Sequence, residues 1–272
     1  MINIDLRGKV ALVAGAGAGG IGSAVTFALA GAGATIAALD VSDELNETTR
    51  RELAARDVTC ETFTVDLMNA DAAANTIDFV VDRMGQLDIL VNVAGGTRQH
   101  QWRRLEESPD SLIKEVFALN LDYVIRLGAD AARHMIARDK GGSIVNFASI
   151  SGLRSAAFHG PYGAAKAAVS AITQTMAIEW AQHRIRVNAI APGSVTTPRI
   201  LKYYDGQDPH ANADGRRSVE STEIANGVLF LVSDLASGIT GQTLTIDAGM
   251  SLRHPAGDLD YFGRMIPAAD QN

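Results

Sequence analysis

The chain has 272 residues, of which 47% are hydrophobic and 20% are charged, as in ordinary globular proteins. Its formal net charge of −7 argues against a nucleic-acid partner, because general nucleic-acid binders need a basic face for the phosphates. With one cysteine, Cys60, the chain cannot form an intrachain disulfide or a cysteine-rich metal site, and its six histidines lack ligand-like spacing, so we expect no bound metal. We find no signal-peptide core and no apolar run long enough to cross a bilayer, and therefore expect a cytoplasmic protein without a membrane partner.

Short apolar runs alternate with longer amphipathic stretches along almost the whole chain. This alternation is typical of βαβ units that build a parallel sheet. The predicted strands cover residues 9–14, 35–39, 59–65, 89–91, 142–146, 186–190 and 243–246. Long helices are predicted over residues 110–138 and 163–183. Because no repeat or low-complexity linker divides the chain, we expect one α/β domain over residues 1–253, followed by a tail over residues 254–272.

The first predicted strand leads directly into a glycine-rich turn. Residues 14–22 have the sequence AGAGAGGIG, and an amphipathic helix follows them. Glycines let the backbone approach a pyrophosphate closely, and the N–H groups at the start of the helix then bind its charge. The position between a strand and a helix favours a dinucleotide site over a glycine-rich packing turn. We therefore expect the cofactor to contact Gly15, Gly19, Gly20, Ile21 and Gly22.

Asp40 follows the second predicted strand, about twenty residues after the glycines. A carboxylate at this position can accept hydrogen bonds from the adenosine ribose and repels a 2′-phosphate, which predicts NAD rather than NADP. The alternative is a helix-capping role, although Ser42 and Asp43 are better placed for it. Asp66 ends the third predicted strand, within reach of an adenine amino group.

Two polar stretches, residues 95–109 and 198–220, interrupt the pattern and are the predicted substrate loops, because loops at the carboxyl ends of parallel strands line the ligand crevice. Segments expected near the substrate carry the basic residues Arg98, His100, Arg103, Arg104, Arg154, His159, Arg199 and Lys202. These residues either attract an acidic substrate or form a solvated surface balanced by Glu106, Glu107 and Asp110. A third possibility is an apolar pocket lined by Trp102, Leu153, Phe158 and Ile200. The sequence leaves the three open, and the candidate substrate residues are Trp102, Arg154, His159 and Ile200.

Tyr162 precedes Lys166 by four residues in the segment PYGAAK. On a helix this spacing puts both side chains on one face. A free phenol has a pKa near ~10, and a neighbouring ammonium favours the phenolate, so that proton transfer near neutral pH becomes possible. The spacing alone is a weak signal, because a tyrosine can simply begin a helix and a lysine can be solvated.

From Leu6 to about Leu252 the chain resembles the short-chain dehydrogenases/reductases. The matching elements are the glycine turn, Asp40, Asp66-Leu67, Asn92-Val93-Ala94-Gly95, Asn120, Ser149, Tyr162 with Lys166, and Pro192-Gly193 with Thr197. Ser149 lies thirteen residues before Tyr162, which is the spacing of the family. Ala14, Val93 and Ala248 depart from the family's usual threonine, asparagine and glycine, and none of the three touches the chemistry.

The resemblance implies a single-domain Rossmann-type fold, a doubly wound parallel sheet of about seven strands with helices on both faces. It also implies a homo-oligomer, a tetramer or a dimer, formed through the helices over residues 110–138 and 163–183. Tyr162 would be the general acid/base, Lys166 would lower the pKa of Tyr162 and hold the nicotinamide ribose, and Ser149 would bind the substrate oxygen. Asn120 would order a water in a proton relay.

The same resemblance implies the remaining cofactor contacts. Asn92, Ala94 and Gly95 would support the cofactor and the central sheet, and Val195 and Thr197 would meet the nicotinamide carboxamide. Further contacts would come from Asp66, Leu67, Pro192 and Gly193.

The expected function is NAD-dependent hydride transfer that interconverts a small-molecule secondary alcohol and a ketone. One alternative is a 3-oxoacyl-thioester reductase, but such enzymes usually take NADP, and Asp40 argues against that cofactor. Another alternative is a non-catalytic NAD-sensing binding protein, which predicts loss of Ser149, Tyr162 or Lys166. All three are present.

Overall fold

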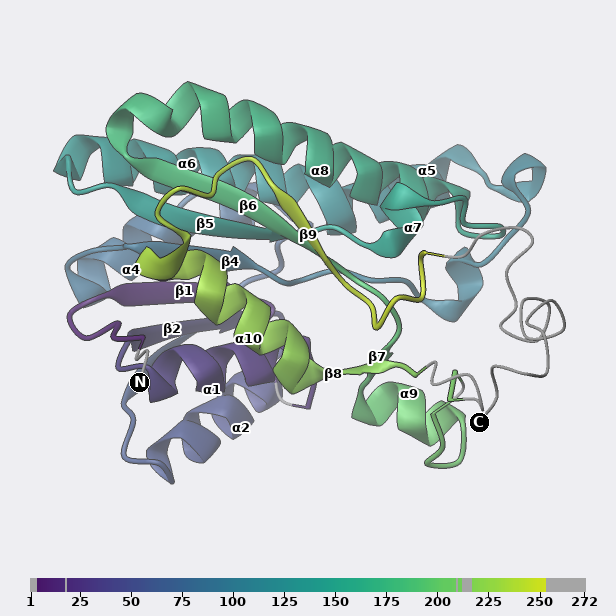
Figure 1. The fold of residues 1–272 in the computed structure, drawn as a ribbon, viewed down its shortest axis with the longest axis horizontal. Helices are drawn as coiled ribbons and strands as arrows, with labels where there is room; N and C mark the ends of the chain where they lie inside the picture. Colours follow the sequence, from purple (N-terminus) through teal and green to yellow (C-terminus); the bar gives the residue numbers. More distant parts are fainter. Residues whose placement is uncertain (1–3, 18, 209, 212–216, 253–272) are drawn as a thin grey trace, which may run out of the picture.

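The computed structural model describes residues 4–17, 19–208, 210–211 and 217–252. Parallel strands form a seven-stranded sheet in the order β3-β2-β1-β4-β5-β6-β9 (Figure 1). The strands are β1 (Val10–Ala14), β2 (Thr35–Asp40), β3 (Cys60–Thr64), β4 (Ile89–Asn92), β5 (Gly142–Phe147), β6 (Ile185–Pro192) and β9 (Thr243–Ile246). Chain order reverses between β1 and β4, which is the switch point of a doubly wound fold. The predicted fold class is therefore confirmed.

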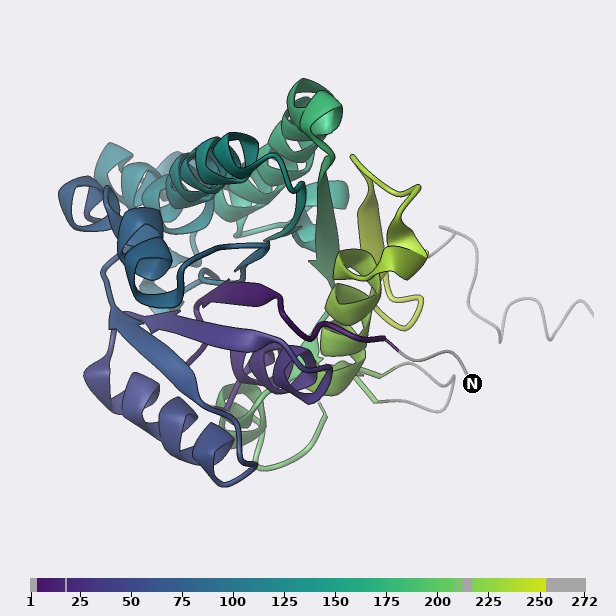
Figure 2. The same cartoon turned by 90° about the vertical axis from the view of Figure 1, so that its left-hand side faces the viewer.

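Helices cover both faces of this sheet. One layer contains α1 (Ile21–Gly31), α2 (Asp43–Ala54) and α10 (Ser221–Val232). The other contains α4 (Thr76–Met84), α5 (Asp110–Phe117), α6 (Tyr123–Arg138) and α8 (Gly160–Trp180). Figure 2 shows α6 and α8, in teal and green, above the sheet and the purple α1 and α2 below it. Short helices α3 (Ala70–Ala73), α7 (Ile150–Leu153) and α9 (Pro198–Tyr203) lie in the connections.

The hydrophobic core lies on both faces of the sheet. All five residues of β1 are buried, because helices cover the strand from above and below. Leu12 and Ala14 belong to the core under α4, α6 and α8, whereas Ala11 and Val13 face the core under α1 and α10. This double burial explains why the strand is an uninterrupted apolar run in the sequence.

The helix predicted over residues 110–138 is divided in two. A π-helical turn, Ala118–Asp122, separates α5 from α6, and the buried Asn120 lies within it. The Asn120 side chain donates a hydrogen bond to the Val116 carbonyl, which fits the wider π turn. The other long helix begins at Gly160 instead of residue 163, and a short 3-10 turn, Ala181–His183, follows its end at Trp180.

The predicted substrate loop over residues 198–220 also contains regular structure. It begins with α9, and its two ends are joined by a parallel pair of two-residue strands, β7 (Val195–Thr196) and β8 (Val219–Glu220). Part of this loop and the predicted tail over residues 254–272 lie outside the described residues.

His134 gives the fold a testable dependence on pH. Its Nε2 accepts the N–H of Leu87 at 3.2 Å, which requires an unprotonated nitrogen, and burial lowers the pKa of the imidazole. The unfolded chain therefore binds a proton more readily than the folded chain, and the free energy of unfolding should fall as pH drops below the ordinary histidine range. We expect a loss of about 1 kcal/mol between pH 8 and pH 5.5 from this hydrogen bond.

Denaturant unfolding of the unmodified protein, His134→Gln and the control His183→Gln at both pH values measures this contribution. The decrease in stability should be smaller in His134→Gln than in the other two proteins. Equal decreases in all three would show that His134 does not couple folding to pH.

Candidate active site

The glycine turn between β1 and α1 leaves no space for a side chain at two of its positions, Gly15 and Gly22. Gly15 has a φ of 92°, and a Cβ on it would lie 2.5 Å from the backbone nitrogen of Ala94, which follows β4. A Cβ on Gly22 would overlap the carbonyl oxygen of Gly15. The glycine turn therefore lies directly against the backbone at the switch point of the sheet.

Ser23 orders the same turn from the first turn of α1. Its hydroxyl accepts the N–H groups of Gly19 at 3.1 Å and Gly20 at 3.2 Å, and donates to the Gly20 carbonyl at 2.9 Å. The N–H groups of Ile21 and Gly22 begin the helix and have no acceptor within it. A narrow turn that ends in such N–H groups fits a pyrophosphate.

Asp40 ends β2 beside this turn. Its Oδ2 accepts the N–H of Gly17 at 2.9 Å, and its Oδ1 accepts the N–H of Val41 at 2.8 Å. Ser42, not Asp40, caps α2, since its hydroxyl accepts the N–H of Leu45. The carboxylate is held in position by two backbone donors and retains lone pairs for a ligand. The structure thus removes the capping alternative for Asp40.

Asp66 and Leu67 follow β3. The Asp66 carboxylate accepts the N–H of Met68 at 2.9 Å, and Leu67 is buried in the core. The carboxylate lies in an exposed turn.

Lys166, Tyr162 and Ser149 gather where β5 ends against α8. Lys166 is 3% exposed, and its ammonium donates to the carbonyl oxygen of Phe147 at 2.7 Å. The Tyr162 ring, one helical turn earlier, has its centroid 5.8 Å from Nζ. Ser149 begins α7, which packs on α8, and its hydroxyl accepts the N–H of Ser151 at 3.1 Å. Burial lowers the pKa of Lys166 to about 7.

Asn120 holds the loop after β4 beside this lysine. Its Oδ1 accepts the N–H of Gly96 at 2.8 Å, and its Nδ2 donates to the Gly96 carbonyl at 3.1 Å. A Cβ on Gly95 would lie 2.7 Å from Asn120 Oδ1 and 3.4 Å from Lys166 Nζ. The four predicted catalytic residues therefore converge at the carboxyl ends of β4 and β5.

Buried polar contacts support this region, and the sequence analysis singled out Asn92 among them but not its partners. Asn92 donates to Asn146 at 2.9 Å, and Asn146 donates to Thr173 at 3.0 Å, which links β4, β5 and α8. Tyr123 donates to the carbonyl of Ala94 at 2.5 Å. Polar residues inside otherwise apolar strands and helices were the available signal for this network.

The predicted nicotinamide contacts follow β6. Pro192 is buried, and Gly193 donates its N–H to the carbonyl of Ile246 at 3.0 Å. Val195 is buried in the β7–β8 pair, and the Thr197 hydroxyl caps α9 by accepting the N–H of Ile200 at 3.3 Å. Ile200 is partly buried in α9. These residues thus form one continuous segment that follows the carboxyl end of β6.

The candidate substrate residues do not all face the same region. The ring of His159 contacts the ring of Trp102 on one side and the ring of Tyr162 on the other, both in edge-to-face arrangements. Arg154 instead donates to the carbonyl of Ser251 at 3.1 Å and fastens the segment after β9.

Several basic side chains near the substrate loops are already paired. Glu115 of α5 binds Arg98 at 3.0 Å and His100 at 3.3 Å, and it also accepts the side chain of the buried Gln101. Arg104 lies 4.0 Å from Glu106. Glu115, which the sequence analysis did not single out, therefore pairs with two of the basic side chains of residues 95–109.

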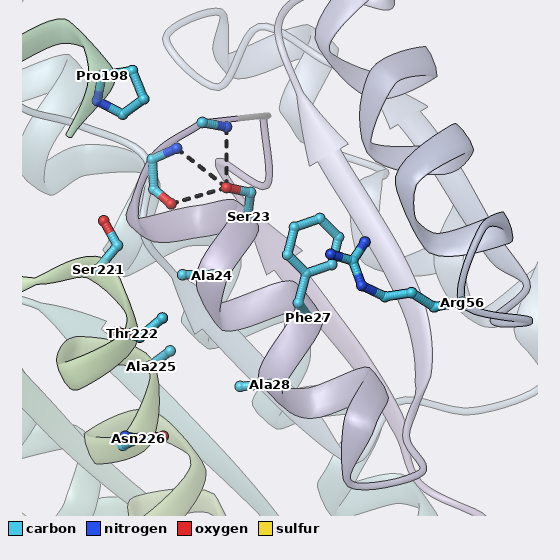
Figure 3. Close-up of a pocket in the computed structure, with 12 residues that line it drawn as sticks. Ser23, Ala24, Phe27, Ala28, Arg56, Pro198, Ser221, Thr222, Ala225 and Asn226 are labelled. Atoms are coloured by element: carbon cyan, nitrogen blue, oxygen red, sulfur yellow. Dashed lines mark hydrogen bonds between the residues drawn. The ribbon is translucent and has the colours of Figure 1, made fainter.

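A cavity of about 530 Å³ runs between α1 and α10 (Figure 3). Gly19, Gly20 and Pro198 line one end of it, and the stacked pair of Phe27 and Arg56 lines another part, with the guanidinium 4.3 Å from the ring centroid. The cavity adjoins the glycine turn from its outer side. Ser149, Tyr162 and Lys166 are not among its lining residues.

The described ranges contain no group of three or more His, Cys, Asp and Glu side chains that could hold a metal ion. Within them, no helix is long and apolar enough to cross a membrane.

Comparisons with known proteins agree with this geometry. The family model described as "Enoyl-(Acyl carrier protein) reductase" matches residues 15–251. The chain belongs to the short-chain dehydrogenase/reductase family. It is thus an oxidoreductase of a family that uses NAD(P).

Relatives cover almost the full chain. The 3-oxoacyl-[acyl-carrier-protein] reductase FabG of Thermotoga maritima is 36% identical over 250 residues, which are 90% of this chain and 98% of that protein. The 3beta-hydroxysteroid dehydrogenase 2 of Eggerthella lenta is 34% identical over 257 residues, 92% of this chain and 97% of the relative. The crystal structure of acetoin dehydrogenase from Enterobacter cloacae has a TM-score of 0.84 and 31% identity, and the match covers 92% of this chain and 98% of that one.

The close packing of the glycine turn can be tested with a matched pair of variants. Gly22→Ala should destabilise the protein by about 1–3 kcal/mol, because its methyl group displaces the backbone of Gly15. Gly20→Ala is the control, since a Cβ there meets nothing within 4 Å. Thermal unfolding without ligand compares the two, and equal melting temperatures would contradict the proposed close packing.

Proposed function

We propose that this short-chain dehydrogenase/reductase interconverts a secondary alcohol and a ketone, with NAD as the hydride carrier and Tyr162 as the acid/base. The observation that carries this proposal is the buried Lys166, whose ammonium lies 5.8 Å from the Tyr162 ring. A buried cation beside a phenol is suited to stabilise a phenolate.

Bound NAD supplies the site that accepts hydride from the alcohol carbon. The Tyr162 phenolate takes the hydroxyl proton during oxidation, and the phenol returns it during reduction. Lys166 stabilises the phenolate, and the negative charge in turn keeps the buried ammonium protonated. The Ser149 hydroxyl donates a hydrogen bond to the substrate oxygen, and Asn120 orders a water for the proton relay.

Asp40 supports the choice of NAD. Two backbone N–H groups fix its carboxylate beside the glycine turn, where the ribose hydroxyls would reach the remaining lone pairs. A 2′-phosphate would bring like charges together, which costs about 1–4 kcal/mol for each pair of unit charges at contact distance.

Reduction of a 3-oxoacyl thioester with NADPH is the second candidate, and the similarity to the Thermotoga maritima reductase favours it. Asp40 argues against NADPH, and the pairing of Arg98 and His100 with Glu115 leaves less charge for an acidic carrier. The exposed Trp102 and Phe158 favour a neutral substrate with apolar carbon. Rates with secondary alcohols and with 3-oxoacyl thioesters, each measured with both cofactors, separate the two candidates.

Tyr162→Phe should lower kcat for alcohol oxidation by about 10²–10⁴-fold, because the proton loses its acceptor. The dissociation constant for NAD, measured by calorimetry, should change by less than about threefold, since the ring remains. A variant that keeps nearly the full rate would exclude Tyr162 as the acid/base.

The preference for NAD over NADP in kcat/KM should decrease about tenfold or more in Asp40→Asn, because the amide keeps the shape of the side chain but removes its charge. Asp66→Asn is the matched control and should affect both cofactors equally. If the unmodified enzyme prefers NADP, the cofactor assignment is wrong.

A further inference from the structure

The imidazole of His159 occupies an unusual position beside the acid/base. It directly precedes α8, and its ring centroid lies 5.6 Å from that of Tyr162. On another side it contacts the indole of Trp102. The imidazole therefore packs directly on the ring of the proposed acid/base.

Nε2 of His159 is shielded from solvent and has no hydrogen-bond partner among the described residues. Leaving such an atom without a partner costs free energy, and native proteins rarely do so without a functional reason. The other buried atoms of this kind belong to side chains such as Asn46, Thr76 and Ser143, in α2, α4 and β5. Within the described ranges, Nε2 is the one that belongs to a ring in contact with Tyr162.

The protonation of His159 suits a neutral oxygen. Burial lowers the pKa of the imidazole, so it is uncharged at neutral pH. A neutral imidazole accepts from a hydroxyl in one tautomer and donates to a carbonyl in the other. It can thus bind both a hydroxyl group and the corresponding carbonyl.

Apolar rings and paired charges surround the same place. Arg98 and His100 are paired with Glu115, and Arg104 lies 4.0 Å from Glu106 and 5.8 Å from the centroid of the Phe158 ring. Trp102 and Phe158 are more than half exposed and offer apolar surface. The Trp102 ring packs against the imidazole at a steep angle, so a substrate oxygen that reaches Nε2 would have to share this space with the indole.

We propose that His159 is a substrate-positioning residue whose Nε2 binds a second, neutral oxygen near the reacting carbon. The preferred substrates are then diols and hydroxyketones rather than simple alcohols or hydroxy acids. This inference rests on the proposed function, because the reacting oxygen must lie at Tyr162.

The experiment compares oxidation of 2,3-butanediol, 2-butanol and 3-hydroxybutanoate by the unmodified enzyme, His159→Phe and His159→Gln. The unmodified enzyme should prefer the diol. His159→Phe keeps an aromatic ring, and should lower kcat/KM for the diol by about 10–100-fold while changing the value for 2-butanol by less than about threefold. His159→Gln should recover part of the diol activity through its amide.

His183→Gln, at the other end of α8, is the matched control and should leave the preference for the diol unchanged. Equal losses on the diol and on 2-butanol, or no loss on either, would show that His159 acts only through its shape and would overturn the inference. A preference of the unmodified enzyme for 3-hydroxybutanoate would overturn it too.

A binding measurement separates this inference from the proposed function. Calorimetric titration of the NAD-saturated protein with 2,3-butanediol and 2-butanol should give tighter binding of the diol, and His159→Phe should abolish the difference. If no alcohol is oxidised but the difference persists, the proposed function fails, while the binding of a neutral oxygen at His159 is still supported. If neither oxidation nor a difference in binding is found, both fail.

Discussion

The buried ammonium of Lys166 is the interaction on which the arrangement of the active site depends. A charge removed from water is unfavourable unless hydrogen bonds and opposite charge compensate it. The carbonyl of Phe147 gives Lys166 one acceptor, and the end of β5 is thereby fixed against α8. Burial lowers the pKa of the ammonium even with this acceptor in place. An anion beside Lys166 completes the compensation, and a phenolate at Tyr162 has the right charge and position.

The π turn at Asn120 lies beside the same lysine, on the other side of Gly95. The wider turn directs Asn120 toward the loop after β4, where both atoms of its amide bind the backbone of Gly96. Gly95 then passes between Asn120 and Lys166 with no room for a side chain. The loop after β4, the end of β5, the π turn and the buried Lys166 therefore contact one another closely.

Much of the fold and of the glycine turn could be predicted, because strands covered on both faces leave continuous apolar runs and a strand-turn-helix junction has its own glycine pattern. Each predicted strand is present, with ends shifted by no more than two residues. The two-residue strands β7 and β8 and the π turn were missed, since they leave no periodicity in the sequence. The pairing of Arg98 and His100 with Glu115 was missed because loop and helix approach each other only in three dimensions.

The two predicted substrate loops are each held by hydrogen bonds to a carboxylate, and neither carboxylate belongs to the proposed catalytic residues. Glu115 holds residues 95–109 on α5, and Asp208 accepts both the N–H and the hydroxyl of Ser218 at 2.7 Å, close to where β7 and β8 pair. The proposed catalytic residues, in contrast, are held by the sheet, by α8 and by the π turn. Substitutions in these loops can therefore change the loop surface without moving Tyr162 or Lys166. Such a separation would let one fold accept different substrates, and relatives of this chain are named for an acyl thioester, a steroid and acetoin.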